Sequence, residues 1–123
     1  MGRRLPLNFS TPKSAVPAGG TVTYTKKIPF PFKIAYLKLH AFVGQSYNLQ
    51  TYIFVGPRGS DQDTNLLANV ENAANFFAGD DTPLEVMNMA EIPHKDFYIT
   101  VKYVNTDAAN AMTGFCFMVV EEL

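Results

Sequence analysis

The residues with the greatest potential for covalent or metal chemistry are two histidines and a single cysteine. His40 lies in an alternating, strand-like segment, His94 lies in the turn-like sequence IPHKD, and Cys116 lies inside the apolar run GFCFMVV. A zinc site needs cysteines and histidines at short spacings, and a reactive thiol needs exposure and a nearby base. The sequence offers neither arrangement. We therefore predict structural histidines, a buried thiol, and no catalytic pair between Cys116 and His40.

The closest approach to a cation-binding motif is the segment SDQDTN. Asp61, Asp63 and Asn65 have the D-x-D-x-N spacing that opens an EF-hand calcium loop. Such a loop needs glycine at its sixth position and glutamate at its twelfth, where this sequence has Leu66 and Asn72. We therefore interpret the segment as an acidic loop and predict no metal ligands.

The sequence also lacks the short motifs that hold a nucleophile or a phosphate group at a tight turn. It contains no G-x-S-x-G, no G-x-x-x-x-G-K and no G-x-G-x-x-G. We therefore predict that the protein is not an enzyme, has no catalytic residues and binds no cofactor.

Charged residues are scarce and unevenly distributed. They make up 17% of the 123 residues, below the roughly 25% of ordinary soluble domains. Residues 1–60 contain eight Lys and Arg and no acid, whereas residues 61–123 contain all eleven acids and two Lys. The basic residues are spaced apart and the net charge is −1, which argues against nucleic-acid binding. The low charge favours contact with other proteins, and interleaved strands would let the two halves neutralise each other.

Membrane and secretory segments are not evident. No apolar run reaches the roughly 18 residues that a membrane-spanning helix needs. The beginning of the chain, MGRRLPLNFS, has two arginines but neither the apolar core nor the cleavage site of a secretory signal. One cysteine allows no intrachain disulfide. We therefore expect a protein that is made and assembled in the cytoplasm.

Most of the chain has the alternating pattern of short strands separated by turn residues. The predicted strands are 21–29, 32–42, 47–55, 84–92, 97–104 and 112–123. Residues 66–77 fit both a short helix and two short strands. This rhythm predicts an all-β, antiparallel β-sandwich with a jelly-roll or related Greek-key topology.

The chain divides into two parts by composition. Residues 1–19 end in the linker-like sequence TPKSAVPAGG and are predicted to form a short extended N-terminal arm and linker. Residues 20–123 are predicted to form a single β-sandwich domain.

One predicted strand is apolar on both faces, which an ordinary half-solvated strand is not. In FPFKIAYLKLHAF the odd positions suit the core, namely Ala35, Leu37, Leu39 and Ala41. The even positions would then face outward, and several are large and apolar. If this strand neighbours 47–55, the outward residues form one contact patch. The predicted contact residues, with two arginines of the arm added, are Arg3, Arg4, Ile34, Tyr36, Phe42, Tyr52 and Phe54.

In its strand rhythm, its arm and its apolar final strand GFCFMVVEEL, the chain resembles the small single jelly-roll proteins that viruses and tailed phages use as capsid decoration or minor capsid proteins. The resemblance is architectural and carries no diagnostic motif. It implies a non-enzymatic component of the virion that forms a homo-oligomer, by analogy a trimer, and binds a major capsid protein.

An alternative is a carbohydrate-binding β-sandwich, such as a lectin-like or receptor-binding module. Tyr36, Tyr52 and Tyr98 are predicted to face outward and could stack against sugar rings. The sequence has no tryptophan, the usual large platform for a sugar, which counts against this alternative.

Overall fold

A computed structural model describes residues 2–69 and 75–123 of the chain. The elements, in chain order, are β1 (Arg4–Asn8), β2 (Thr21–Ile28), β3 (Phe32–Ala41), β4 (Leu49–Gly56), β5 (Thr64–Asn65), the 3-10 turn η1 (Leu66–Asn69), β6 (Thr82–Met87), β7 (Glu91–Ile92), β8 (Phe97–Asn105) and β9 (Cys116–Glu122). The predicted strand 84–92 is divided between β6 and β7. No helix in the described part is long and apolar enough to cross a bilayer.

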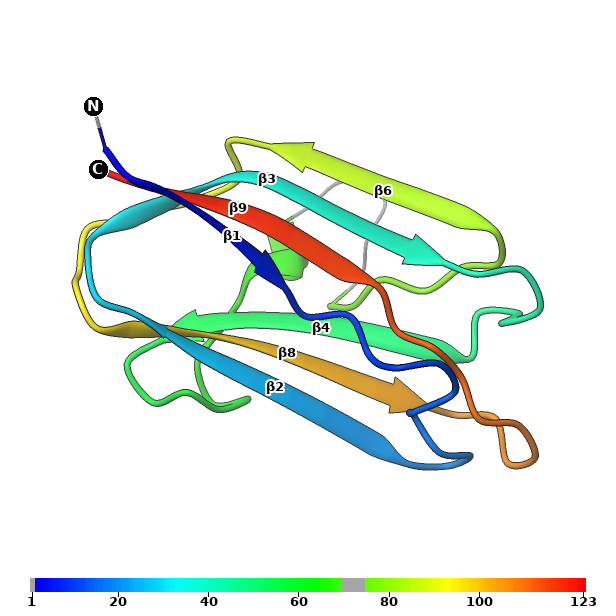
Figure 1. Cartoon of the computed structure of the whole chain (residues 1–123). Coiled ribbons are helices and arrows are strands. Elements are labelled where there is room, and N and C mark those ends of the chain that lie inside the picture. Colours follow the sequence, from blue (N-terminus) through cyan, green and yellow to red (C-terminus); the bar gives the residue numbers. More distant parts are fainter. Residues whose placement is uncertain (1, 70–74) are drawn as a thin grey trace.

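The strands form two antiparallel sheets that pack face to face (Figure 1). The upper sheet has the order β1-β9-β3-β6, with β7 also beside β3, and the lower sheet has the order β2-β8-β4-β5. The pairs β1·β9, β2·β8, β3·β6 and β4·β5 are nested, as in one long hairpin rolled up across two sheets. This is jelly-roll topology, so the predicted fold class is confirmed.

The core fills the space between the two sheets with alternate side chains from both. Side chains with no exposed surface include those of Phe32, Leu37, Leu39, Ile53, Ile99, Val101, Tyr103, Met118 and Val120. Along β8 and β9 every second residue faces the core, which is the two-residue period of a strand that has one face on a core.

A bulge in β3 changes which of its side chains face the core. The partner of Ile34 in β9 is Val120 and the partner of Tyr36 is Val119, so Ala35 is an extra residue in the ladder. An extra residue reverses the alternation at that point. Ile34 is therefore fully buried, and the prediction that it faces outward as contact surface is wrong.

The N-terminal segment lies within the sandwich instead of extending from it. Residues 4–8 form β1, which pairs along β9, and Leu7, Phe9 and Val16 are buried in the core. The expected detachable arm is thus an edge strand of the upper sheet, and the expected boundary at residue 19 does not separate it from the rest.

The segment 66–77, which the sequence left open between helix and strands, contains both kinds of structure. Residues 66–69 form η1, and Phe77 forms a bridge with Thr51 at the edge of the lower sheet. Residues 70–74, on which part of this prediction falls, lie outside the described residues.

Candidate interaction surfaces

The outer side of the upper sheet carries a row of large apolar side chains, which we call the outer aromatic face. It consists of Tyr36 and Phe42, on and just after β3, and of Phe115, Phe117 and Val119, on and just before β9. Ring centroids lie 6.3 Å apart between Tyr36 and Phe117 and 6.3 Å apart between Phe42 and Phe115. Aromatic rings of the two central strands thus contact each other at two places along the sheet.

These side chains face outward because their neighbours in sequence fill the core. Cys116, Met118 and Val120 alternate with them on β9 and are fully buried. The five members of the face are themselves half-buried, since they cover one another. The face extends to both edges of the sheet, where Pro6 lies opposite Val119 and the 65% exposed Met87 lies opposite Tyr36.

Polar side chains lie within the outer aromatic face, because Lys38 and His40 project from β3 between Tyr36 and Phe42. Lys38 lies 3.9 Å from Glu85, and His40 lies 4.0 Å from Asp81 at the edge formed by β6. Aromatic and polar side chains are thus mixed on this face, as they are in many protein–protein contacts.

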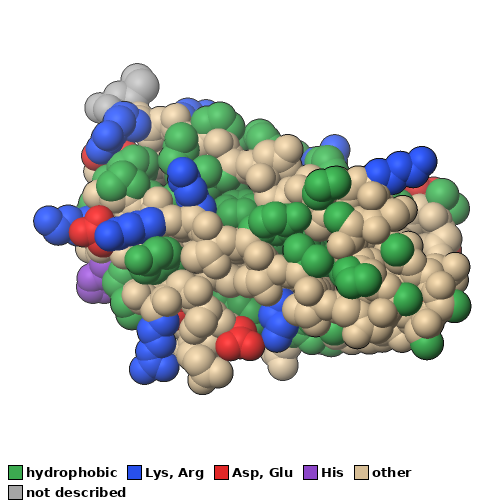
Figure 2. Space-filling model, turned by 60° about the horizontal axis from the view of Figure 1, so that its bottom comes forward, with side chains coloured by type: hydrophobic (Ala, Val, Ile, Leu, Met, Phe, Trp, Pro, Cys, Tyr) green, Lys and Arg blue, Asp and Glu red, His purple; other side chains and the backbone are tan. Residues whose placement is uncertain are grey.

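The two arginines predicted as contacts lie at the end of the molecule where the chain termini meet. Arg3 donates hydrogen bonds to Glu122 at 3.0 and 3.1 Å, and Arg4 lies 2.9 Å from Glu121. The pair with Arg3 lowers the pKa of Glu122 and raises that of Arg3. Figure 2 shows that most of the Lys and Arg side chains on this side of the molecule lie toward the same end.

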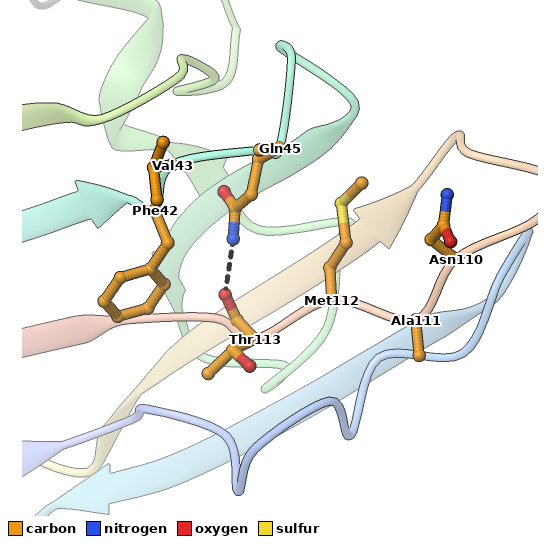
Figure 3. Close-up of a pocket in the computed structure, with 8 residues that line it drawn as sticks. Phe42, Val43, Gln45, Asn110, Ala111, Met112 and Thr113 are labelled. Carbon is orange, nitrogen blue, oxygen red and sulfur yellow. Dashed lines mark hydrogen bonds between the residues drawn. The ribbon is translucent and has the colours of Figure 1, made fainter.

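An open pocket of about 380 Å³ lies at the opposite end, between the loop after β3 and the loop before β9. Its walls are Phe42–Gln45 and Asn110–Thr113. Figure 3 shows the amide of Gln45 reaching across to the other loop, where it donates to the carbonyl oxygen of Thr113 at 2.8 Å. Phe42 belongs both to this pocket and to the outer aromatic face, so the two surfaces are continuous.

The loop after β3 is held by a carboxylate. Asp80 accepts hydrogen bonds from the backbone N–H of Gly44 at 2.6 Å and of Ser46 at 3.4 Å. Gly44 has a φ of 90°, which few other residues adopt. The loop therefore holds Val43, 80% exposed, beside the pocket.

The outer side of the lower sheet is partly covered by the loop between β4 and β5. Asp63 accepts a hydrogen bond from the backbone N–H of Gly59 at 2.8 Å and holds this loop in a turn. Asp61 accepts one from Lys102 at 3.2 Å, which lowers the pKa of Asp61. Of the two aspartates of the calcium-like motif, Asp63 thus stabilises the loop and Asp61 forms an ion pair with Lys102. No group of three or more His, Cys, Asp or Glu side chains placed to hold a metal ion is found in residues 2–69 and 75–123.

The aromatic residues of β4 belong to this lower face. Tyr52 stacks with Phe54 at 6.0 Å and contacts Phe76 at 5.4 Å, and Phe54 is only 7% exposed. Tyr98, on β8, lies against Gly59 of the covering loop.

The structure therefore divides the predicted contact patch. β3 and β4 belong to different sheets, so Tyr36 and Phe42 lie on one side of the molecule while Tyr52 and Phe54 lie on the other. The condition on which that patch depended, that 32–42 and 47–55 are neighbours, is not met. Tyr36 is likewise separated from the other two tyrosines proposed to stack on sugars, and the three form no single platform.

Several contact candidates were missed by the sequence, notably Phe115, Phe117, Val119 and Met87. The sequence did contain a signal for the two phenylalanines. Phe115 and Phe117 flank Cys116, and neighbouring residues of a strand face opposite sides of the sheet, so a buried Cys116 places both rings on the outer side. Cys116 is fully buried and burial raises its pKa. His40 projects from the other face of the same sheet, so the two residues form no catalytic pair.

No protein-family model and no curated protein matches this chain. A chain in the structure of infectious bursal disease virus, Gx strain, is similar over 99% of this chain with a TM-score of 0.51 and 13% sequence identity. A chain in the crystal structure of a serine protease of Aeromonas sobria is similar over 97%, with a TM-score of 0.47 and 11% identity. This chain spans 33% and 26% of their respective lengths. The likeness to the virus chain concerns the β-sandwich fold.

Proposed function

We propose that this protein is a non-enzymatic structural subunit of a virus particle, such as a capsid decoration or minor capsid protein. In this proposal it binds a major capsid protein and forms a homo-oligomer, for which a trimer is the first expectation. The observation that carries the proposal is the outer aromatic face. A cluster of partly exposed aromatic side chains on one face of a sheet fits a protein–protein contact.

The position of the face supports attachment to a larger surface. The face lies on the two central strands of a sheet, and it continues into the pocket beside Val43. The fold likeness to a chain of a virus structure is compatible with this role.

The proposal is tested by measuring attachment to particles. Purified protein is added to virus particles that lack it, and the bound amount is measured by sedimentation and quantitative mass spectrometry. Phe117→Lys and Met87→Glu place charges in and beside the outer aromatic face, and both are expected to reduce binding several-fold. Thr64→Glu, an exposed position on β5 in the other sheet, is the matched control and should bind normally.

Two results would contradict the proposal. One is that mass spectrometry does not detect the unmodified protein in purified virus particles from which no protein has been removed. The other is binding of Met87→Glu and Phe117→Lys at the level of Thr64→Glu, with thermal melting showing all three variants folded.

The geometry gives less support to the sugar-binding alternative. Tyr52 is packed between Phe54, Phe76 and Lys102, so its ring faces are largely occupied. A glycan-array screen with Tyr52→Ala as control distinguishes this alternative, because a lectin would bind at millimolar sugar and lose binding on substitution.

A further inference from the structure

The sheet edges of this molecule differ in how well they are protected against pairing with another strand. An edge strand presents unpaired backbone N–H and C=O groups, and natural proteins often block them with proline or charge. The upper sheet ends in β1 on one side and in β6 on the other, and the lower sheet ends in β2 on the side next to β1.

Both edges of the upper sheet carry a proline where it blocks pairing. Phe9 donates to the carbonyl of Cys116, so alternate residues of β1 bond to β9, and Pro6 falls among the residues whose backbone faces outward. Asn88 donates to the carbonyl of Ala35, and the same alternation turns the backbone of Pro83 in β6 outward. Each proline therefore removes an N–H that would point away from the sheet.

β2 has no such proline. Asn105 donates to the carbonyl of Gly20 at 2.9 Å, which makes Val22, Tyr24 and Lys26 the residues that bond to β8. The outward N–H and C=O groups then belong to the alternate residues, which are all exposed, namely Thr21, Thr23, Thr25 and Lys27. Of the strands at these three edges, β2 is the longest, with 8 residues.

We propose that β2 pairs with β2 of a second copy of this chain, antiparallel and centred on Tyr24, so that two lower sheets join into one. This pairing deepens the proposed function. It rests on that function in one respect, namely that an assembly subunit contacts copies of itself. In this register all four outward residues are used. Thr23 faces Thr25 of the partner subunit, and Lys27 faces Thr21 of the partner subunit.

The charge pattern of β2 favours this self-pairing. The two lysines occupy one end of the strand, and antiparallel pairing about Tyr24 places each of them opposite an uncharged residue. The two copies of Lys26 lie four residues apart along the strands, or about 14 Å, which exceeds the screening length of about 8 Å at physiological salt. In-register pairing of equal residues would place the lysines of the two copies side by side, where they repel each other. The antiparallel pairing keeps them apart.

The space beside the edge can receive the partner strand's side chains. A groove of about 340 Å³ lies between the edges of β1 and β2, lined by residues that include Asn8, Phe9 and Tyr24. Inward-facing side chains of the added strand would lie at this groove, while its threonines would extend the outer row of Thr21, Thr23 and Thr25.

Hydrogen exchange of the unmodified chain, followed by NMR at increasing protein concentration, tests the pairing directly. The amides of Val22 and Tyr24 bond to β8 and should be protected at every concentration, which provides an internal control. The amides of Thr23 and Thr25 face solvent in a monomer. Pairing should slow their exchange by about tenfold or more as the concentration rises.

Thr23→Pro provides the matching variant, because the lost N–H does not serve β8. Because this two-fold pairing joins two chains, it replaces the trimer expected by analogy. Light scattering after size exclusion should give the mass of two chains for the unmodified protein and for Thr23→Val, and 13.6 kDa for Thr23→Pro. If Thr23→Pro does not fold, the exchange experiment on the unmodified chain decides.

Two outcomes would overturn the pairing. A monomer with rapid exchange at Thr23 and Thr25 at all concentrations rejects it, and leaves attachment through the outer aromatic face to be judged by the particle experiment. An oligomer that survives Thr23→Pro, with those amides still exchanging rapidly, places the contact between copies elsewhere on the molecule.

Discussion

Tyr103 connects three segments that are distant in sequence. Its hydroxyl donates to the backbone carbonyl of Phe9 at 2.8 Å, and its ring meets Tyr24 at a centroid distance of 6.4 Å. Gly114 lies so close that a Cβ there would overlap the ring. Burial raises the pKa of the Tyr103 phenol, so the hydroxyl remains a hydrogen-bond donor at ordinary pH.

Replacing Tyr103 by Phe should destabilise the fold, because the carbonyl of Phe9 would lose its donor. A buried polar group left unpaired costs about 1–2 kcal/mol. Urea unfolding followed by circular dichroism measures the change. Tyr47→Phe, at a position 67% exposed, is the control and should have almost no effect. Equal stability of the two variants would show that the hydrogen bond contributes nothing.

Single residues of β3 show where the predicted alternation of buried and outward side chains is correct and where it is not. Leu37, Leu39 and Ala41 are buried as the alternation predicts. Ile34 is not where the alternation places it, because the bulge at Ala35 inserts one residue into the ladder. A bulge depends on the partner strand, and nothing in the composition of IAYL signals it.

At the scale of elements, β1 is the strand whose role differs most from the expectation. Pro6 weakens the strand signal, and TPKSAVPAGG reads as a linker, so the segment looked detachable. Proline is nevertheless acceptable at this position because its missing N–H would face away from β9. Leu7 and Phe9 then enter the core with 8% and 6% of their surfaces exposed.

Deleting residues 2–9 should therefore destabilise the sandwich strongly. Burial of each of the two large side chains contributes about 1.5–3 kcal/mol, and the acceptor of the Tyr103 hydroxyl is lost as well. Thermal melting of this deletion, compared with a deletion of residues 2 and 3 alone, measures the effect. Similar melting temperatures for the two deletions would contradict a structural role for β1.

At the scale of the whole molecule, the two oppositely charged halves of the sequence are brought together. Arg3, Arg4, Lys33 and Lys38 from the basic half pair with Glu85, Glu121 and Glu122 from the acidic half. The jelly roll interleaves strands from both halves in the upper sheet, so this neutralisation follows from topology. The sequence predicted both the sandwich and the neutralisation of charge between its two halves. It could not predict which strands share a sheet, and the assignment of strands to sheets determines which residues form a common contact surface.

Acid should weaken the ion pair between Arg3 and Glu122 at the charged end of the molecule. The pKa of Glu122 is lowered from its ordinary value of 4.5 by the hydrogen bond and charge of Arg3. The unfolded chain therefore binds the proton more readily, so this contribution to stability is complete above the ordinary pKa and is lost as pH falls through the lower, folded value.

Carboxyl NMR titration of Glu122, with unfolding measured above and below its ordinary pKa, tests this expectation. Glu122→Gln should show a smaller loss of stability in acid than the unmodified protein. An unshifted titration of Glu122 would mean that Arg3 does not hold it in solution.

The first and last strands lie side by side, and the backbone N–H of Glu122 donates to the carbonyl of Arg3 at 2.8 Å (Figure 1). The order in which the strands follow each other along the chain is therefore open to rearrangement. A short linker could join residue 123 to residue 2, and new ends could be opened at the exposed Val43–Gly44 turn. Such a circular permutant would keep every strand pair while moving the free ends to the pocket, where a tag or a fused domain would then obstruct it.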